Sequence, residues 1–85
     1  MKPIMVALQD GQKLNDAMFR LLVCLGEHPD PSGKTPFCET TVQRMVDQLG
    51  PWWDYNKVVK VADDLRDIGY PIGVVGGFLC WRPAK

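Results

Sequence analysis

The sequence has no surplus of charge of either sign, because its ten basic residues are balanced by ten acidic ones. A chain without net charge lacks the strong global field that many small nucleic-acid-binding proteins use to attract a polyanion. Any contact with nucleic acid must therefore come from a local patch of basic side chains.

Long apolar runs are also missing. No segment approaches the roughly 20 consecutive apolar residues that a membrane-spanning helix needs. The apolar start of the chain is interrupted by Pro3 and Gln9, which leaves it too short for the apolar region of a signal sequence. We therefore expect a cytoplasmic protein with no membrane partner.

Residues typical of metal sites and catalytic centres are few. The three cysteines, Cys24, Cys38 and Cys80, form no close pair, and an odd number argues against a disulfide framework. His28 is the only histidine, and no nucleotide-binding, hydrolase or metalloprotease motif occurs. The sequence predicts neither a cofactor nor a bound metal, and it does not indicate an enzyme. Cys24 falls among apolar helical positions and is expected to be a small buried hydrophobic residue.

The length and composition are typical of a single globular domain. A chain of 85 residues buries one modest core, and a hydrophobic content of 46% is sufficient to form it. We divide the chain into an N-terminal arm or short strand over residues 1–13, a folded domain over residues 14–81, and a tail over residues 82–85.

Two segments show the apolar spacing i, i+3, i+4, i+7 that is typical of an amphipathic helix. The first follows Leu14, with Asn15 as a candidate N-cap and Gly26 near its end; its apolar residues are Met18, Leu21, Leu22 and Leu25. The second follows a cap at Thr40 or Thr41; its apolar residues are Val42, Met45, Val46 and Leu49. Between them we expect a surface loop over residues 27–34 and a short edge strand over residues 35–38.

A third helix is predicted over residues 55–68, with Asp54 as its N-cap and Gly69 at its end. Its core face has five apolar residues: Val58, Val61, Ala62, Leu65 and Ile68. Two adjacent tryptophans, Trp52 and Trp53, precede it. Either both complete the core, or one packs beneath the third helix while the other is exposed, because neighbouring residues on a turn do not easily point the same way.

The C-terminal part predicts a β-hairpin. Two apolar stretches, residues 70–75 and 78–81, are separated by Gly76 and Gly77, and a Gly-Gly pair provides the positive φ angles of a tight hairpin turn. The predicted order is helix, short strand, helix, tight turn, helix, hairpin. This is a mainly α fold with a small β-hairpin (α+β), and its layout is that of a winged helix-turn-helix with three helices plus a C-terminal wing.

Two segments carry a family resemblance. LLVCLGEHPDPSGKTPFCETTVQRMVDQL, residues 21–49, resembles the opening of the winged-helix domains in phage and plasmid replication initiators. LRDIGYPI, residues 65–72, is similar to the end of the recognition helix and the first wing strand in winged-helix repressors such as the biotin operon repressor. The chain departs from these families at residues 51–55, where its turn is longer and far more aromatic.

The resemblance implies a phage or mobile-element DNA-binding protein, a transcriptional regulator or replication accessory, that acts as a homodimer on double-stranded DNA. It places Asn56, Lys57 and Lys60 in the major groove, where Asn can pair with adenine and Lys with guanine or phosphate. Trp52, Trp53 and Tyr55 would support the turn before this helix, and Arg44 could touch a backbone phosphate.

An alternative stays open, in which the same fold is a protein–protein interaction module that inhibits or adapts a host or partner protein. The aromatic turn with Trp52, Trp53 and Tyr55 would dock the partner, because Trp is enriched among interface hot spots. The carboxylates of Asp63 and Asp67 would add charge to that surface. The uncharged tip of the predicted wing favours this alternative, because wings that bind DNA often have Arg or Lys there.

Overall fold

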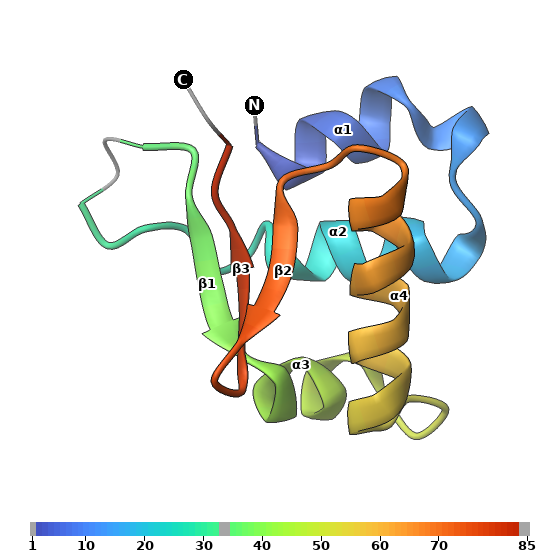
Figure 1. Ribbon diagram of the computed structural model, residues 1–85, viewed down its shortest axis with the longest axis vertical. Helices are drawn as coiled ribbons and strands as arrows, with labels where there is room; N and C mark the ends of the chain where they lie inside the picture. The colour runs from blue at the N-terminus through green and yellow to red at the C-terminus, as the bar shows by residue number, and fades with distance from the viewer. Residues whose placement is uncertain (1, 33–34, 84–85) are drawn as a thin grey trace.

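The protein is described by a computed structural model over residues 2–32 and 35–83. Figure 1 shows an α+β domain in which, as far as the described residues extend, four α-helices lie to one side of a three-stranded antiparallel sheet. The elements are α1 (Pro3–Gln9), the 3-10 turn η1 (Gly11–Lys13), α2 (Asp16–Leu25), β1 (Cys38–Thr41), α3 (Val42–Leu49), α4 (Tyr55–Asp67), β2 (Ile72–Val75) and β3 (Phe78–Trp81).

The three predicted helices are present as α2, α3 and α4, and each begins at a side-chain cap. Asn15, Thr41 and Asp54 each accept a hydrogen bond from the backbone N–H three residues later, at 2.9, 3.1 and 2.7 Å. Such caps satisfy a donor that the first turn of a helix leaves unpaired. The predicted caps at Asn15 and Asp54 are confirmed, and Thr41 rather than Thr40 caps α3.

The predicted hairpin is confirmed. Gly76 and Gly77 connect β2 to β3 with φ angles of 57° and 80°, the backbone of a two-residue primed turn. The order of strands in the sheet is β1-β3-β2, so β3 pairs with both neighbours and lies at the centre. The hairpin is therefore attached to β1 through its second strand, β3.

The edge strand begins later than predicted, at Cys38 instead of residue 35. The preceding residues belong to the loop, where the carboxylate of Asp30 accepts hydrogen bonds from the hydroxyls of Ser32 and Thr35. These bonds lower the pKa of Asp30. The loop therefore continues to Phe37, and residues 33 and 34 of the predicted loop lie outside the described residues.

The prediction of an arm or short strand at the start of the chain is wrong for residues 3–13, which form α1 and η1. Pro3, Val6 and Ala7 are buried, at the spacing i, i+3, i+4 of one helical face, and α1 packs on α2 (Figure 1). A stretch this short fits both the 3.6-residue period of a helix and the two-residue period of a strand. The distinguishing signal was Pro3, because proline is favoured in the first turn of a helix.

Two further assignments near the C-terminus differ from prediction. Ile68 was placed on the core face of its helix, but α4 ends at Asp67 and Ile68 is exposed. Arg82 was placed in the tail, yet its N–H donates to the carbonyl of Pro71 and its guanidinium pairs with Glu39 at 3.2 Å. Residues 84 and 85 of the predicted tail lie outside the described residues.

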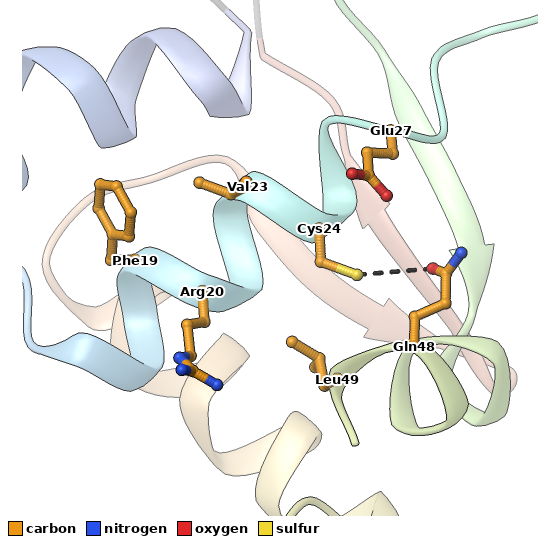
Figure 2. Close-up of a pocket in the computed structure, with 7 residues that line it drawn as sticks. All are labelled: Phe19, Arg20, Val23, Cys24, Glu27, Gln48 and Leu49. Carbon is orange, nitrogen blue, oxygen red and sulfur yellow. Dashed lines mark hydrogen bonds between the residues drawn. The ribbon is translucent and has the colours of Figure 1, made fainter.

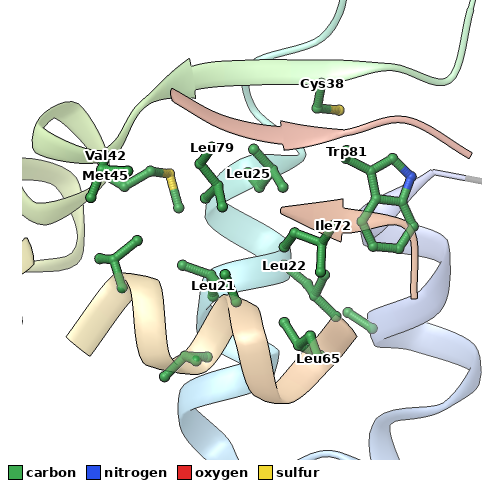
Figure 3. Packing of buried hydrophobic residues seen from close by; sticks show 14 of the residues in the cluster. Leu21, Leu22, Leu25, Cys38, Val42, Met45, Leu65, Ile72, Leu79 and Trp81 are labelled. Atoms are coloured by element: carbon green, nitrogen blue, oxygen red, sulfur yellow. The ribbon is translucent and has the colours of Figure 1, made fainter. Parts of the chain in front are cut away.

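The core lies between the sheet and the helices α2, α3 and α4. Alternate residues of the strands point inward, and Figure 3 shows Leu79 and Trp81 of β3 facing the leucines of α2. Burying such side chains contributes roughly 1.5–3 kcal/mol each. The largest fully buried side chains are Trp81, Leu21, Leu22, Leu25, Met45, Leu65 and Leu79.

Tyr70 connects the core to the N-terminal elements. Its ring stacks on Trp81 with 6.2 Å between ring centroids, and its hydroxyl donates a hydrogen bond of 2.9 Å to the Asp10 carboxylate, between α1 and η1. Burial, followed by the bond to Asp10, raises the pKa of Tyr70. This contact fixes the N-terminal segment to the C-terminal half of the chain.

We predict that Tyr70→Phe lowers the free energy of unfolding by about 1 kcal/mol, because one partly buried hydrogen bond to a carboxylate is lost. Since the folded-state pKa of Tyr70 is raised, the stabilisation is fully present below the ordinary tyrosine pKa of about 10 and is lost as pH rises through the folded-state pKa. Urea unfolding of both proteins at neutral and alkaline pH measures this. A difference that stays constant with pH would contradict the assignment.

Candidate functional site

The N-termini of α3 and α4 meet the tip of the hairpin at one end of the molecule (Figure 1). The backbone N–H of Val42, the first residue of α3, donates to the carbonyl of Gly77 at 2.9 Å. On the other side of the tip, the Tyr55 hydroxyl lies 3.9 Å from the position that a Cβ would take at Gly77. The hairpin tip is therefore held between the two helices.

The turn before α4 separates the two adjacent tryptophans. Gly50 has a φ of 107°, and the N–H of Trp53 donates to the Gly50 carbonyl at 3.2 Å, which closes the turn. Trp53 is only 7% exposed, whereas Trp52 is 85% exposed. The prediction that one packs beneath the helix while the other is exposed is confirmed. The alternative that both complete the core is wrong, and Trp53 is placed in the core instead of on a contact surface.

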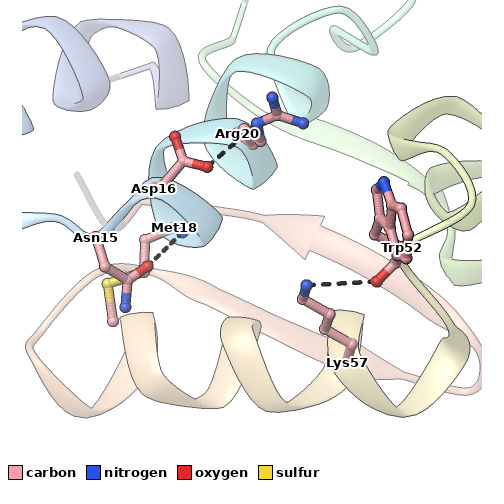
Figure 4. A network of polar contacts seen from close by, with 6 residues as sticks. All are labelled: Asn15, Asp16, Met18, Arg20, Trp52 and Lys57. Carbon is pink, nitrogen blue, oxygen red and sulfur yellow. Dashed lines mark hydrogen bonds and ion pairs between the residues drawn. The ribbon is translucent and has the colours of Figure 1, made fainter.

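Lys57 is held against this turn. Its ammonium lies 4.5 Å from the centroid of the Trp53 ring and donates to the carbonyl of Trp52 at 3.4 Å; Figure 4 shows the second contact. A cation over an aromatic face at an exposed site is stabilised by about 0.5–1 kcal/mol. The positive charge of Lys57 is therefore located beside the turn at the start of α4.

The outward face of α4 changes its charge along the helix. Asn56 and Lys60 are exposed on its N-terminal half, and Asp63 and Asp67 are exposed farther along. Lys60 forms an i,i+4 ion pair with Asp64 at 3.3 Å. Exposed pairs of this kind contribute at most about 1 kcal/mol, so the ammonium can exchange Asp64 for another anion.

Arg44 adds a second basic group near this end of the molecule. It is exposed on α3, and within the described part of the chain its guanidinium makes no hydrogen bond or ion pair. The structure places Arg44 on α3 and Tyr55, Asn56 and Lys57 on the first turn of α4. It leaves Asp63 and Asp67 farther along α4.

The hairpin has an apolar surface that the sequence analysis missed. Val75 and Phe78 are cross-strand partners directly beside the Gly-Gly turn, and both are exposed, Val75 at 72%. Both lie on the sheet face opposite to Leu79 and Trp81. The alternation of residues in β3 could have indicated this, because Phe78 and Leu79 must point to opposite faces of the sheet.

A groove between α2 and α3 was also not predicted. Figure 2 shows its walls, and its volume is about 430 Å³. It is lined by Phe19, Arg20, Val23, Cys24, Glu27, Gln48 and Leu49. Cys24 is half-buried at its wall instead of fully buried, because its thiol donates to the Gln48 amide oxygen at 3.5 Å. The same oxygen lies 2.6 Å from His28 Nε2.

The three cysteine thiols all have raised pKa values. Burial raises the pKa of the thiols of Cys24, Cys38 and Cys80, so all three are protonated at neutral pH and are weak nucleophiles. Across residues 2–32 and 35–83, no cluster of three His, Cys, Asp or Glu side chains is arranged to hold a metal ion. The exposed groups at this end of the molecule are suited to binding a partner through charge, amide and aromatic contacts.

Comparison with protein-family models, with curated proteins and with solved structures finds no match. Within the described part of the chain, no helix has the length and apolar character needed to cross a membrane. The geometry of the exposed side chains is therefore the basis for the function proposed below.

We predict that replacing the two adjacent tryptophans changes the free energy of unfolding by very different amounts. Trp53→Ala should lower the free energy of unfolding by about 3–5 kcal/mol, because it leaves a cavity beneath α4. Trp52→Ala should change it by less than about 0.5 kcal/mol, because its indole is exposed. Urea unfolding at low protein concentration, where the chain is a monomer, measures both, and acrylamide quenching of fluorescence under the same conditions should fall only in Trp52→Ala. Equal destabilisation by the two variants would contradict the structure.

Proposed function

We propose that this protein is a small winged-helix module that binds double-stranded DNA, with the N-terminal half of α4 in the major groove. The order of elements from α2 to β3, together with the sheet order β1-β3-β2, supports this proposal. This arrangement puts the β2–β3 hairpin beside the N-terminus of α4, where a wing lies next to a recognition helix. That single observation carries the proposal.

The exposed side chains at this end give the contact its chemistry. Asn56 is suited to a bidentate pair with adenine, and Lys60 to guanine or a phosphate. Arg44 on α3 and Lys57 beside the turn would bind the backbone on either side of the groove, because phosphate contacts position a protein on duplex DNA. Tyr55, between α4 and the hairpin tip, has a hydroxyl that can reach the same backbone.

The acidic residues of α4 limit how the helix can enter the groove. Asp63 follows Asn56 by seven residues, which is about 10 Å along a helix. A helix that enters by its N-terminal end keeps Asp63 and Asp67 away from the phosphates, whereas a helix lying along the groove would bring them into repulsive contact. The proposed docking is therefore end-on. The proposed role is that of a phage or mobile-element regulator or replication accessory.

We predict that binding to a random duplex, measured by fluorescence polarisation, weakens as salt increases. Arg44→Ala should reduce the slope of log K against log salt by about 0.9, because one phosphate contact is lost. Asn56→Ala should leave binding to random DNA almost unchanged, since an amide that reads bases contributes to sequence preference.

Lys13→Ala is the matched control. It removes the same charge from η1, far from α4 in the chain and without a place in the proposed interface, and it should leave the slope unchanged. An absence of binding at low salt, or equal effects of Arg44→Ala and Lys13→Ala, would exclude the proposed interface.

The exposed indole of Trp52 favours a second candidate function, docking of a protein partner. Trp52 is 85% exposed, yet it has no place in the proposed DNA contact. Tyr55, Asp63 and Asp67 would extend that surface along α4. Trp52→Ala separates the two functions in a polarisation assay with DNA. If Trp52 docks a protein partner, the variant should bind DNA with unchanged affinity. A loss of DNA affinity would assign Trp52 to the DNA interface instead.

A further inference from the structure

The backbone at Trp52 is held in a closed turn, and its indole is 85% exposed. The turn behind it is closed by the hydrogen bond from Trp53 to Gly50, and the carbonyl of Trp52 accepts from Lys57 at 3.4 Å. A Trp side chain has only two χ angles, so it loses little conformational entropy when a partner buries it, and Trp is enriched at interface hot spots. The exposure of Trp52 therefore points to a recess that it fills.

The groove between α2 and α3 has the size and chemistry of such a recess. Its volume of about 430 Å³ lies within the range of pockets that hold small organic molecules. Phe19, Val23 and Leu49 supply apolar walls for the body of an indole (Figure 2). The groove is bordered by one cation, Arg20, and one carboxylate, Glu27.

The polar groups of the groove complement an indole. Glu27 makes no side-chain hydrogen bond or ion pair within the described part of the chain, so its carboxylate is available to accept from the indole N–H. Among the described residues, the ion pair of Arg20 is an exposed i,i+4 pair with Asp16 at 3.4 Å, which contributes at most about 1 kcal/mol. Its guanidinium can therefore turn to stack on an aromatic face.

A second copy of the chain is the occupant that fits both features. Trp52 follows Leu49, a residue of the groove wall, by three positions, so the turn that bears the indole begins at one wall of the groove. Its exposure shows that Trp52 does not fill the groove of its own copy. A two-fold rotation places each indole in the other groove, and an isologous interface makes each contact twice.

The charges on α2 are self-complementary in the same arrangement. Arg20 lies on α2 three residues before Val23, and Glu27 lies four residues after it in the turn beyond the helix; both border the groove. When α2 lies antiparallel to its copy around Val23, Arg20 of each copy faces Glu27 of the other. Such pairing favours one register and orientation over others.

From these observations we propose that the chain forms a two-fold symmetric dimer in which Trp52 of each copy occupies the groove between α2 and α3 of the other. This proposal does not depend on DNA binding, and the two tests can fail separately.

Sedimentation equilibrium over a range of concentrations tests the dimer. The unaltered chain should associate, and Trp52→Ala should weaken association by about 30-fold or more, the loss expected when a hot-spot residue is removed. Leu8→Ala and Val75→Ala are matched controls, because these apolar residues are 76% and 72% exposed and lie outside the groove. They should leave association unchanged, and all variants should keep the melting temperature of the monomer.

Mixing two defective variants tests whether the contact is reciprocal. Trp52→Ala keeps an intact groove, and Arg20→Glu keeps its indole but places a carboxylate in its own groove. Each alone should be monomeric, whereas an equimolar mixture should form a heterodimer with one intact contact. In the mixture only the Arg20→Glu chain contains Trp52. The fluorescence of the mixture should shift to the blue, because this indole becomes buried in the groove of the other chain.

Three results would overturn the proposal. The first is a monomer at every concentration, and the second is association of Trp52→Ala as tight as that of the unaltered chain. The third is a mixture that fails to associate while both variants remain folded by circular dichroism. A monomer whose Trp52 is buried only by a different protein would assign the indole to that partner instead.

Discussion

The burial of Trp81 in the central strand is the interaction on which the rest of the fold depends. β3 pairs with β1 on one side and β2 on the other, so the position of Trp81 fixes the register of the whole sheet against the helices. Its ring also stacks on Tyr70, whose hydroxyl reaches Asp10 beside α1. One indole near the end of the chain thereby links the sheet, the helical core and the N-terminal helix.

The turn between α3 and α4 decides which chemistry the surface displays. Its tight geometry sends Trp53 into the core and Trp52 into solvent, while Asp54 caps α4 and Lys57 lies over the buried ring. The same few residues therefore complete the core and create two exposed features, a basic helix end and an indole. The proposed DNA contact uses the first feature, and the proposed dimer uses the second.

The candidate site was predictable from the sequence only in part. Asn56, Lys57 and Lys60 were placed on the exposed side of α4 because the apolar spacing of Val58 and Leu65 defines its core face, and the structure agrees. The recess between α2 and α3 was not predictable, because its walls come from helices separated by a long loop. Cys24 illustrates the difference: its helical position indicated burial, but its neighbour Gln48 on α3 leaves it at the wall of the groove.

Local signals in the sequence are sufficient to specify the helices and the hairpin of this protein. Caps such as Asn15 and Asp54, the Gly76–Gly77 turn and the helical spacing of leucines act over a few residues, and local geometry follows from them. Only the tertiary structure decided that residues 3–9 form a docked helix, that Trp52 is exposed while Trp53 is buried, and that α2 and α3 enclose a groove. These features depend on which distant surfaces are available to bury an apolar side chain, and a short stretch of sequence does not contain that information.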